Sequence, residues 1–127
     1  MINEKILSDM RKVSLLIVED NEDIIKLIDN TFKMLVNDIT CAKDGLEAIE
    51  DFKKSKPDII LTDIRMPHCN GEEMMKAIRE LDKEIPIIVI SAYVHELEDQ
   101  SLASYIYEKP IDFKKLLLKI DELISKD

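Results

Sequence analysis

Residues 59–71 read IILTDIRMPHCNG, and this stretch decides which class of fold we expect. It opens with Ile59 to Thr62, a run that is nearly continuous in large aliphatic side chains. A short run of this kind, without polar alternation, is typical of a strand covered on both faces, as strands of parallel sheets are. Asp63 follows the run directly. The stretch therefore indicates a buried parallel strand that carries a carboxylate to one edge of a sheet.

On both sides of this strand, apolar runs alternate with segments of helical periodicity. The five runs expected to form strands are Ser14 to Val18, Asp38 to Ala42, Ile59 to Thr62, Ile87 to Ser91 and Tyr105 to Glu108. Apolar stripes at helical spacing, each able to pack a helix against a sheet, lie at Ile24, Ile28, Phe32 and Leu35; at Leu46, Ile49 and Phe52; at Met74, Ile78 and Leu81; and at Phe113, Leu117, Ile120 and Ile124. Because parallel strands joined by helices need right-handed crossovers with helices on both faces, this order predicts an α/β fold with a doubly wound, five-stranded parallel sheet.

The chain of 127 residues is long enough for one hydrophobic core and too short for two. We expect residues 1–12 to form an N-terminal extension with an extra turn or helix, followed by one domain over residues 13–127. The stretch from Glu96 to Ala103 is a weaker and shorter helical candidate than the other connections.

The charge balance is acidic, with 27 Asp and Glu against 18 Lys and Arg and a formal net charge of −9. Such a chain repels nucleic-acid phosphates and anionic membrane surfaces, so we expect neither as a direct partner. Cys41 and Cys69 form no close pair of the kind found in zinc or redox motifs, and we interpret both as reduced thiols. Charged residues interrupt the apolar ones from Met1 to Lys12, unlike a signal peptide. These features predict a cytoplasmic protein.

Polar side chains follow four of the predicted strands. Glu19 and Asp20 come after the first strand, Asp63 after the third, Ser91 at the end of the fourth and Lys109 after the fifth. Ligands of open parallel sheets bind beyond the carboxyl ends of the strands, so we expect these residues to converge there. Carboxylates held together repel one another, and a hard divalent cation keeps them ionised. Magnesium fits best, because it takes one or two carboxylates and completes its octahedron with water and phosphate oxygens.

This residue set is suited to phosphoryl transfer. A lysine opposite the carboxylates holds a phosphoryl oxygen as a compact cation, and a serine hydroxyl donates to another. Asp63 would be the nucleophile, because carboxylates form aspartyl phosphates when a metal neutralises the incoming charge.

Each residue also has an ordinary structural explanation. Asp20 or Asn21 could cap the following helix, and Lys109 before a proline could be an exposed lysine. His68 and Cys69 stand together and suggest a soft-metal site. Without a third ligand, an exposed loop is the favoured interpretation of that pair. The convergence of the whole strand-end set at one edge favours a chemical role for it.

Four motifs resemble those of response-regulator receiver domains of two-component signalling systems. They are Val18-Glu19-Asp20, Asp63-Ile64-Arg65-Met66-Pro67 with Gly71 four residues on, Ser91-Ala92 and Lys109-Pro110. Each motif is common by itself, but their order and their placement after successive strands make the set specific. The resemblance covers nearly the whole chain after Lys12. It implies a flavodoxin-like fold with strand order 2-1-3-4-5 and a site between the first and third strands.

The resemblance implies a role for each matching residue. Asp63 is the implied phosphoacceptor, and Asp20, Asp63 and the main-chain carbonyl of Arg65 are the implied ligands of Mg²⁺. Glu19 is implied to act on the metal through a bound water.

Ser91 and Lys109 are implied to contact the phosphoryl group. Arg65 and Tyr93 occupy positions where the family's side chains stand at the mouth of the site and tune the lifetime of the phosphoryl group. Two solvated side chains without a large kinetic effect remain the alternative for that pair.

By resemblance, the chain is a signalling switch that catalyses only its own aspartyl phosphorylation and dephosphorylation. The implied donor is a phosphohistidine on a sensor histidine kinase or phosphotransfer protein, and the implied output is altered binding of an unidentified downstream protein or output domain. Two contexts stay open. The chain is either a stand-alone regulator or the N-terminal receiver of a larger multidomain response regulator or hybrid kinase.

Two other functions share this architecture. A flavodoxin-type binding module needs a phosphate cradle rich in glycine, serine or threonine after the first strand, but residues 19–23 read EDNED. A phosphohydrolase of the aspartyl-phosphate kind usually has a second aspartate two residues after the nucleophile, where this chain has Arg65. Both functions are therefore disfavoured.

The sequence departs from the family's pattern in two places. Ile106 stands three residues before Lys109, where receivers usually carry Tyr or Phe. By strand parity, Tyr105 and Tyr107 lie on the opposite face from Ile106 and do not substitute for that aromatic residue unless a bulge intervenes. Ser91 and Lys109 are 18 positions apart, about one helical turn of roughly 3.6 residues shorter than in the family. We therefore predict a short or irregular segment between Glu96 and Ser104.

Overall fold

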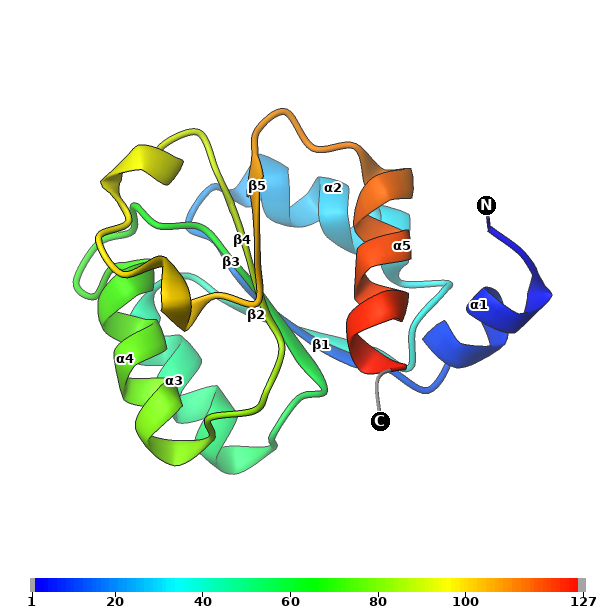
Figure 1. The fold of residues 1–127 in the computed structure, drawn as a ribbon, viewed down its shortest axis with the longest axis horizontal. Helices are drawn as coiled ribbons and strands as arrows, with labels where there is room; N and C mark the ends of the chain where they lie inside the picture. Colours follow the sequence, from blue (N-terminus) through cyan, green and yellow to red (C-terminus); the bar gives the residue numbers. More distant parts are fainter. Residues whose placement is uncertain (1, 126–127) are drawn as a thin grey trace.

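Five parallel strands form a single sheet in the computed structural model, which describes residues 2–125 (Figure 1). The strands are β1 (Ser14–Val18), β2 (Asp38–Ala42), β3 (Ile59–Thr62), β4 (Ile87–Ser91) and β5 (Tyr105–Glu108). Their order is β2-β1-β3-β4-β5, and every neighbouring pair is parallel. The predicted bounds of all five strands and the flavodoxin-like strand order are therefore confirmed.

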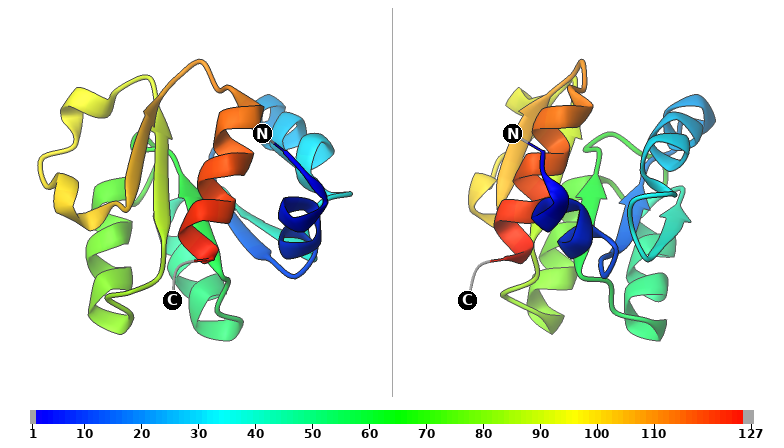
Figure 2. Two further views of the ribbon diagram at one scale, coloured as in Figure 1. Left: turned by 45° about the vertical axis from the view of Figure 1, so that its right-hand side comes forward. Right: turned by 90° about the vertical axis from the view of Figure 1, so that its right-hand side faces the viewer.

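Five α-helices cover the two faces of the sheet. They are α1 (Glu4–Met10), α2 (Glu22–Phe32), α3 (Gly45–Lys54), α4 (Gly71–Leu81) and α5 (Phe113–Ile124). Helices α3 and α4 lie on one face, and α1, α2 and α5 lie on the other (Figure 2). Each helix begins after an Asn or Asp whose side chain accepts from a backbone N–H of the first turn, a cap typically worth about 1 kcal/mol.

The continuous apolar strands divide their side chains between two cores. In β1, Leu16 and Val18 point into the core under α3 and α4, while Leu15 and Ile17 point into the core under α1, α2 and α5. This division follows from the two-residue period of a strand. The expectation that the central strands are buried on both faces is correct.

The N-terminal extension forms helix α1. Met10, at its end, is fully buried, and α1 packs against α5. The expected extra helix before the first strand is confirmed. No helix within residues 2–125 has both the length and the apolar character needed to cross a bilayer.

The connection between β4 and β5, residues 92–104, contains two three-residue 3₁₀ helices, η1 (Val94–Glu96) and η2 (Gln100–Leu102). It confirms the predicted short or irregular segment. Side chains of α4 hold it in place. The Glu72 carboxylate accepts from the backbone N–H groups of Glu98 and Asp99, at 2.9 and 3.1 Å. The Arg79 guanidinium donates to the carbonyl of Leu102 at 3.0 Å.

Candidate functional site

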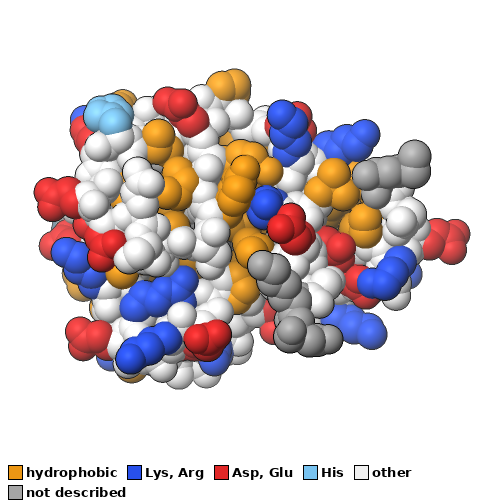
Figure 3. All heavy atoms as spheres, in the orientation of Figure 1, with side chains coloured by type: hydrophobic (Ala, Val, Ile, Leu, Met, Phe, Trp, Pro, Cys, Tyr) orange, Lys and Arg blue, Asp and Glu red, His pale blue; other side chains and the backbone are white. Residues whose placement is uncertain are grey.

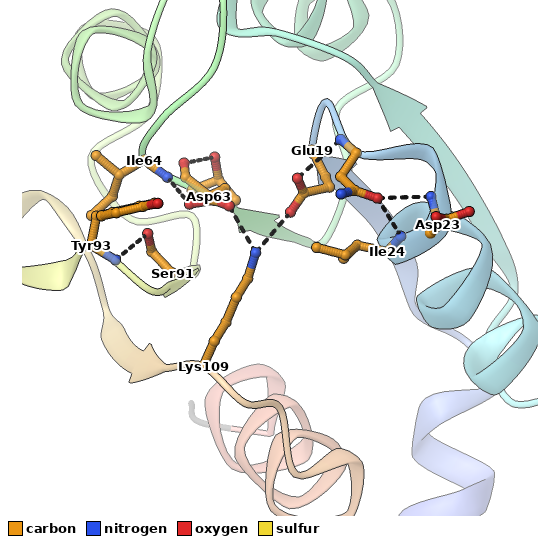
Figure 4. Close-up of polar contacts among 10 residues, drawn as sticks. Glu19, Asp23, Ile24, Asp63, Ile64, Ser91, Tyr93 and Lys109 are labelled. Atoms are coloured by element: carbon orange, nitrogen blue, oxygen red, sulfur yellow. Dashed lines mark hydrogen bonds and ion pairs between the residues drawn. The ribbon is translucent and has the colours of Figure 1, made fainter.

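The carboxyl ends of β1, β3, β4 and β5 bring Glu19, Asp63, Ser91 and Lys109 together, and we call these four residues the rim (Figure 4). Val18 and Thr62 are register partners, so the residues that follow them emerge side by side. Ser91 pairs with Glu108 in the same way, and the backbone N–H of Lys109 donates to the Ser91 carbonyl at 3.0 Å. The predicted convergence is confirmed for these four residues, whereas Asp20, the fifth residue of the predicted set, is exposed and is not part of the rim.

Lys109 links the two acidic residues of the rim. Its Nζ lies 2.9 Å from Asp63 Oδ2 and 3.4 Å from Glu19 Oε1. Burial lowers the pKa of Lys109, but the hydrogen bond to Asp63 and the charges of Glu19 and Asp63 outweigh it and raise the pKa overall. Lys109 is therefore a charged, partly buried lysine held between two carboxylates, and not the freely exposed lysine of the alternative interpretation.

Glu19 is an acid under electrostatic strain. It is only 5% exposed. Burial and the charge of Asp63 raise its pKa to about 7, although the N–H of Asn21 and the ammonium of Lys109 act in the opposite direction. Burial is thus the main reason why the ionised form of Glu19 is disfavoured. An added cation at this place would favour the ionised form of Glu19.

Asp63 is held in one orientation. Its side chain is nearly buried, Oδ1 accepts from the backbone N–H of Ile64 at 2.6 Å, and Oδ2 faces Lys109. Gly71, the first residue of α4, lies directly behind it. A Cβ at Gly71 would stand 2.1 Å from the Asp63 carbonyl oxygen. Only glycine allows α4 to begin this close to the strand end.

Ser91 and Asp20 differ in burial and in their hydrogen bonds. Ser91 is fully buried, and its Oγ accepts from the backbone N–H of Tyr93 at 3.0 Å. Asp20 is exposed. Asn21, and not Asp20, caps α2, because its Oδ1 accepts from the N–H groups of Asp23 and Ile24 at 2.9 and 3.1 Å. Asp20 is therefore left without a capping role.

The rim has the donor chemistry of a hard-cation site but is not a preassembled metal cluster. Within residues 2–125, no three His, Cys, Asp or Glu side chains lie close enough together to hold an ion. The carboxylates of Glu19 and Asp63 are oxygen ligands of the kind magnesium prefers, and Asp20 follows Glu19 directly in sequence. The residues present fit magnesium. The ligand roles of Asp20, Asp63, the Arg65 carbonyl and Glu19 remain predictions.

Arg65 and Tyr93 form a cluster with Glu96, a residue that sequence reasoning did not single out. Arg65 Nε lies 2.8 Å from Glu96 Oε1, and a second guanidinium nitrogen contacts Oε2. The guanidinium carbon lies 3.7 Å from the centroid of the Tyr93 ring. The hydrogen bond between Arg65 and Glu96 raises the pKa of Arg65 and lowers that of Glu96. Because Arg65 and Glu96 are 31 residues apart in sequence, no local pattern connects them.

The loop after Asp63 is only partly the exposed loop that we expected. His68 is exposed and has a positive φ of 66°. Cys69 is buried, against our expectation, because the loop folds back onto α3, where the Cys69 carbonyl accepts from the N–H of Gly45 at 2.9 Å. Burial raises the pKa of the Cys69 thiol, so the thiolate is disfavoured.

The tyrosines of β5 lie away from Ser91, as strand parity predicts. Ile106 packs against the core under α3 and α4, whereas Tyr107 packs on the opposite side. The Tyr107 hydroxyl donates to the carbonyl of Lys115, and the ring of Tyr105 lies beneath Lys119. Apolar side chains gather over β5 on this face of the molecule, with charged ones beside them (Figure 3).

The family described as response regulator receiver domain matches residues 15–121. This chain belongs to the receiver domain family. Receiver domains are signalling switches of two-component systems.

Two solved structures of receivers illustrate the likeness. The response regulator TrrA from Thermotoga maritima, in complex with Mg²⁺–BeF, is 30% identical with a TM-score of 0.78, over 87% of this chain and 98% of that chain. The receiver domain is also similar to a chain of the CheX–CheY–BeF₃–Mg²⁺ complex from Borrelia burgdorferi, at 30% identity and a TM-score of 0.81, over 90% of each chain.

A curated relative, the transcriptional regulatory protein PrrA of Mycobacterium leprae, is 31% identical over 61% of this chain. The receiver domain spans only 33% of the length of that relative. The activity of that longer protein is therefore a property of the relative and is not assigned to this chain.

Proposed function

We propose that this receiver domain accepts a phosphoryl group on Asp63 from a phosphohistidine donor, in a reaction that requires Mg²⁺, and thereby switches the binding of a partner. The observation that carries the proposal is the Lys109 ammonium, shared between Asp63 and Glu19 at the carboxyl end of β3. A phosphoryl group on Asp63 would bring oxygens that the same lysine can hold.

The chain's own groups have separate roles in this proposal. A carboxylate oxygen of Asp63 forms a bond to phosphorus, while the bond from phosphorus to the donor's imidazole nitrogen breaks and the imidazole keeps the electron pair. The Ile64 N–H and Lys109 orient the Asp63 carboxylate. Ser91 would donate its hydroxyl hydrogen to a phosphoryl oxygen, because its Oγ already accepts from Tyr93 N.

Magnesium would be held by Asp20, Asp63 and the main-chain carbonyl of Arg65, with Glu19 acting through a water. When bound, it would neutralise the carboxylates and the charge of the incoming phosphoryl group. The raised pKa of Glu19 agrees with this role, since burial and, to a smaller extent, the charge of Asp63 disfavour its ionised form, which a bound cation would stabilise.

The proposed unit is a receiver over residues 13–127, with residues 1–12 as its extension; residue 1 and residues 126 and 127 lie outside the described part. We propose that it catalyses only its own phosphorylation and dephosphorylation, in a cytoplasm. Its partners would be a sensor kinase or phosphotransfer protein and a downstream protein or output domain. A stand-alone regulator and the receiver of a longer protein both agree with this function.

Intact-mass analysis after incubation with acetyl phosphate, with and without magnesium, tests the proposal. We expect one added phosphoryl group that is stable to acid, labile to base and hydroxylamine, and dependent on magnesium. Asp63→Asn should abolish it. Asp38→Asn, the same change at an exposed position of the edge strand β2, should leave it intact. Equal modification of Asp63→Asn and the parent would refute the assignment.

A further inference from the structure

The ion pair between Arg65 and Glu96 joins the loop after the phosphoacceptor to helix η1. The pair is bidentate, and the Tyr93 ring stacks on the guanidinium. Tyr93 lies on the Ser91 side of Asp63, away from Glu19 (Figure 4). The cluster therefore stands beside the rim without being part of it.

Glu96 lies in a segment whose backbone is fixed by hydrogen bonds and by packing of the next residue. Its backbone N–H donates to the Tyr93 carbonyl at 2.9 Å, and the next residue, Leu97, is 4% exposed and packs in the core under α3 and α4. The following two N–H groups donate to the buried Glu72. The position of the Glu96 backbone is thus set by the fold, while the Arg65 side chain, which is 56% exposed, can leave the pair.

Arg65 is the cation nearest in sequence to Asp63, two residues away. Its described side-chain hydrogen bonds go to Glu96, and those of Asp63 come from Ile64 and Lys109. A guanidinium is well suited to bind phosphoryl oxygens through two parallel N–H groups. Glu96 therefore occupies the N–H groups of Arg65 that could otherwise bind phosphoryl oxygens.

We propose that Glu96 is a positioning residue that restrains the Arg65 guanidinium beside Tyr93, and so limits how readily a phosphoryl donor is captured at Asp63. The inference rests on the proposed phosphorylation of Asp63. Exposed ion pairs are weak: they favour the paired over the unpaired state by a factor of roughly two to five. The restraint on Arg65 is therefore reversible. Release would also free Tyr93, whose backbone N–H is bonded to Ser91.

The test measures the rate of phosphorylation by acetyl phosphate with magnesium, by intact mass, over a range of acetyl phosphate concentrations. Glu96→Gln should raise the rate at low concentration by about two- to fivefold, through a lower half-saturating concentration and with little change in the maximal rate. Glu96→Asp, which keeps the carboxylate, should stay nearer the parent.

Two further variants separate a path through Arg65 from a general charge effect. Glu98→Gln removes the same charge from an exposed position of the same segment and should leave the rate unchanged. Combining Arg65→Gln with Glu96→Gln should remove the gain. The Arg65 Nε–H signal in ¹⁵N NMR should shift in Glu96→Gln without any phosphoryl donor.

The outcomes distinguish the two proposals. If the parent is phosphorylated but Glu96→Gln matches it, or if the gain persists without Arg65, the positioning role of Glu96 is wrong and the phosphorylation of Asp63 stands. If the parent takes up no phosphoryl group, both are wrong.

Discussion

The rim and the β4–β5 connection are built by different means. The rim side chains stand at the ends of paired strands, so the sheet register places them. The connection contains two three-residue 3₁₀ helices, and the side chains of Glu72 and Arg79 on α4 hold it. The rim thus depends on strand pairing, whereas the connection depends on side-chain contacts with α4, so a change in one set of interactions need not disturb the other.

The aromatic residues of β5 are not placed to carry a signal away from Ser91. With Ile106 packed in the core and Tyr105 and Tyr107 directed away from Ser91, the described residues offer no aromatic side chain on β5 to follow the Ser91 hydroxyl inward. We therefore expect the response to phosphorylation to act through Ser91 and the adjoining connection, without an aromatic rotamer change.

We expect the largest effect from a substitution that displaces the rim. Gly71→Ala places a Cβ 2.1 Å from the Asp63 carbonyl oxygen, so α4 or the strand end must move. We expect the free energy of unfolding to fall by about 3–5 kcal/mol, measured by urea unfolding followed by circular dichroism. Gly45→Ala would bring its Cβ no closer than 2.6 Å to the Cys69 sulfur and 2.7 Å to the Cys69 carbonyl oxygen, so it should cost less. An equal or larger loss in Gly45→Ala would contradict this ranking.

A smaller effect should loosen the connection and spare the rim. Glu72→Gln keeps the size of the side chain but can accept from only one of the N–H groups of Glu98 and Asp99 through its remaining oxygen. We expect a loss of about 2 kcal/mol and faster amide hydrogen exchange at residues 98 and 99. Glu80→Gln, at an exposed position of the same helix, is the control. Unchanged exchange at these amides would show that Glu72 does not hold the connection.

The smallest effect concerns the charge of the rim. The pKa of Glu19 is raised from 4.5 to about 7, so between these values the folded state binds more protons than the unfolded state. The free energy of unfolding should therefore fall as the pH rises through this window, by roughly 1–2 kcal/mol between pH 5 and 7. Urea unfolding in the presence of a chelator measures it.

Glu19→Gln should remove most of this pH dependence. Glu50→Gln, the same change at an exposed position of α3, should not. A parent whose stability is flat or rising over this window would show that Glu19 is not strained by burial.

The strands and the rim were predictable because both are local consequences of sequence. Ile59 to Thr62 can only be buried on both faces, and the residue after such a strand must emerge at its carboxyl end. The N-cap of α2 was not decided between Asp20 and Asn21, because either side chain can cap a helix. The buried state of Cys69 was missed, because it follows from a contact with Gly45 that leaves no periodic signal.

The amino-acid sequence by itself determined the order of elements, the burial of the central strands and the set of polar residues at the strand ends. These follow from periodicities of two and 3.6 residues and from the geometry of parallel sheets. Only the tertiary structure decided that Lys109 bridges Glu19 and Asp63, that Glu96 holds Arg65 and that Glu72 and Arg79 hold the shortened connection. These contacts join residues far apart in sequence, and their geometry depends on how the layers pack.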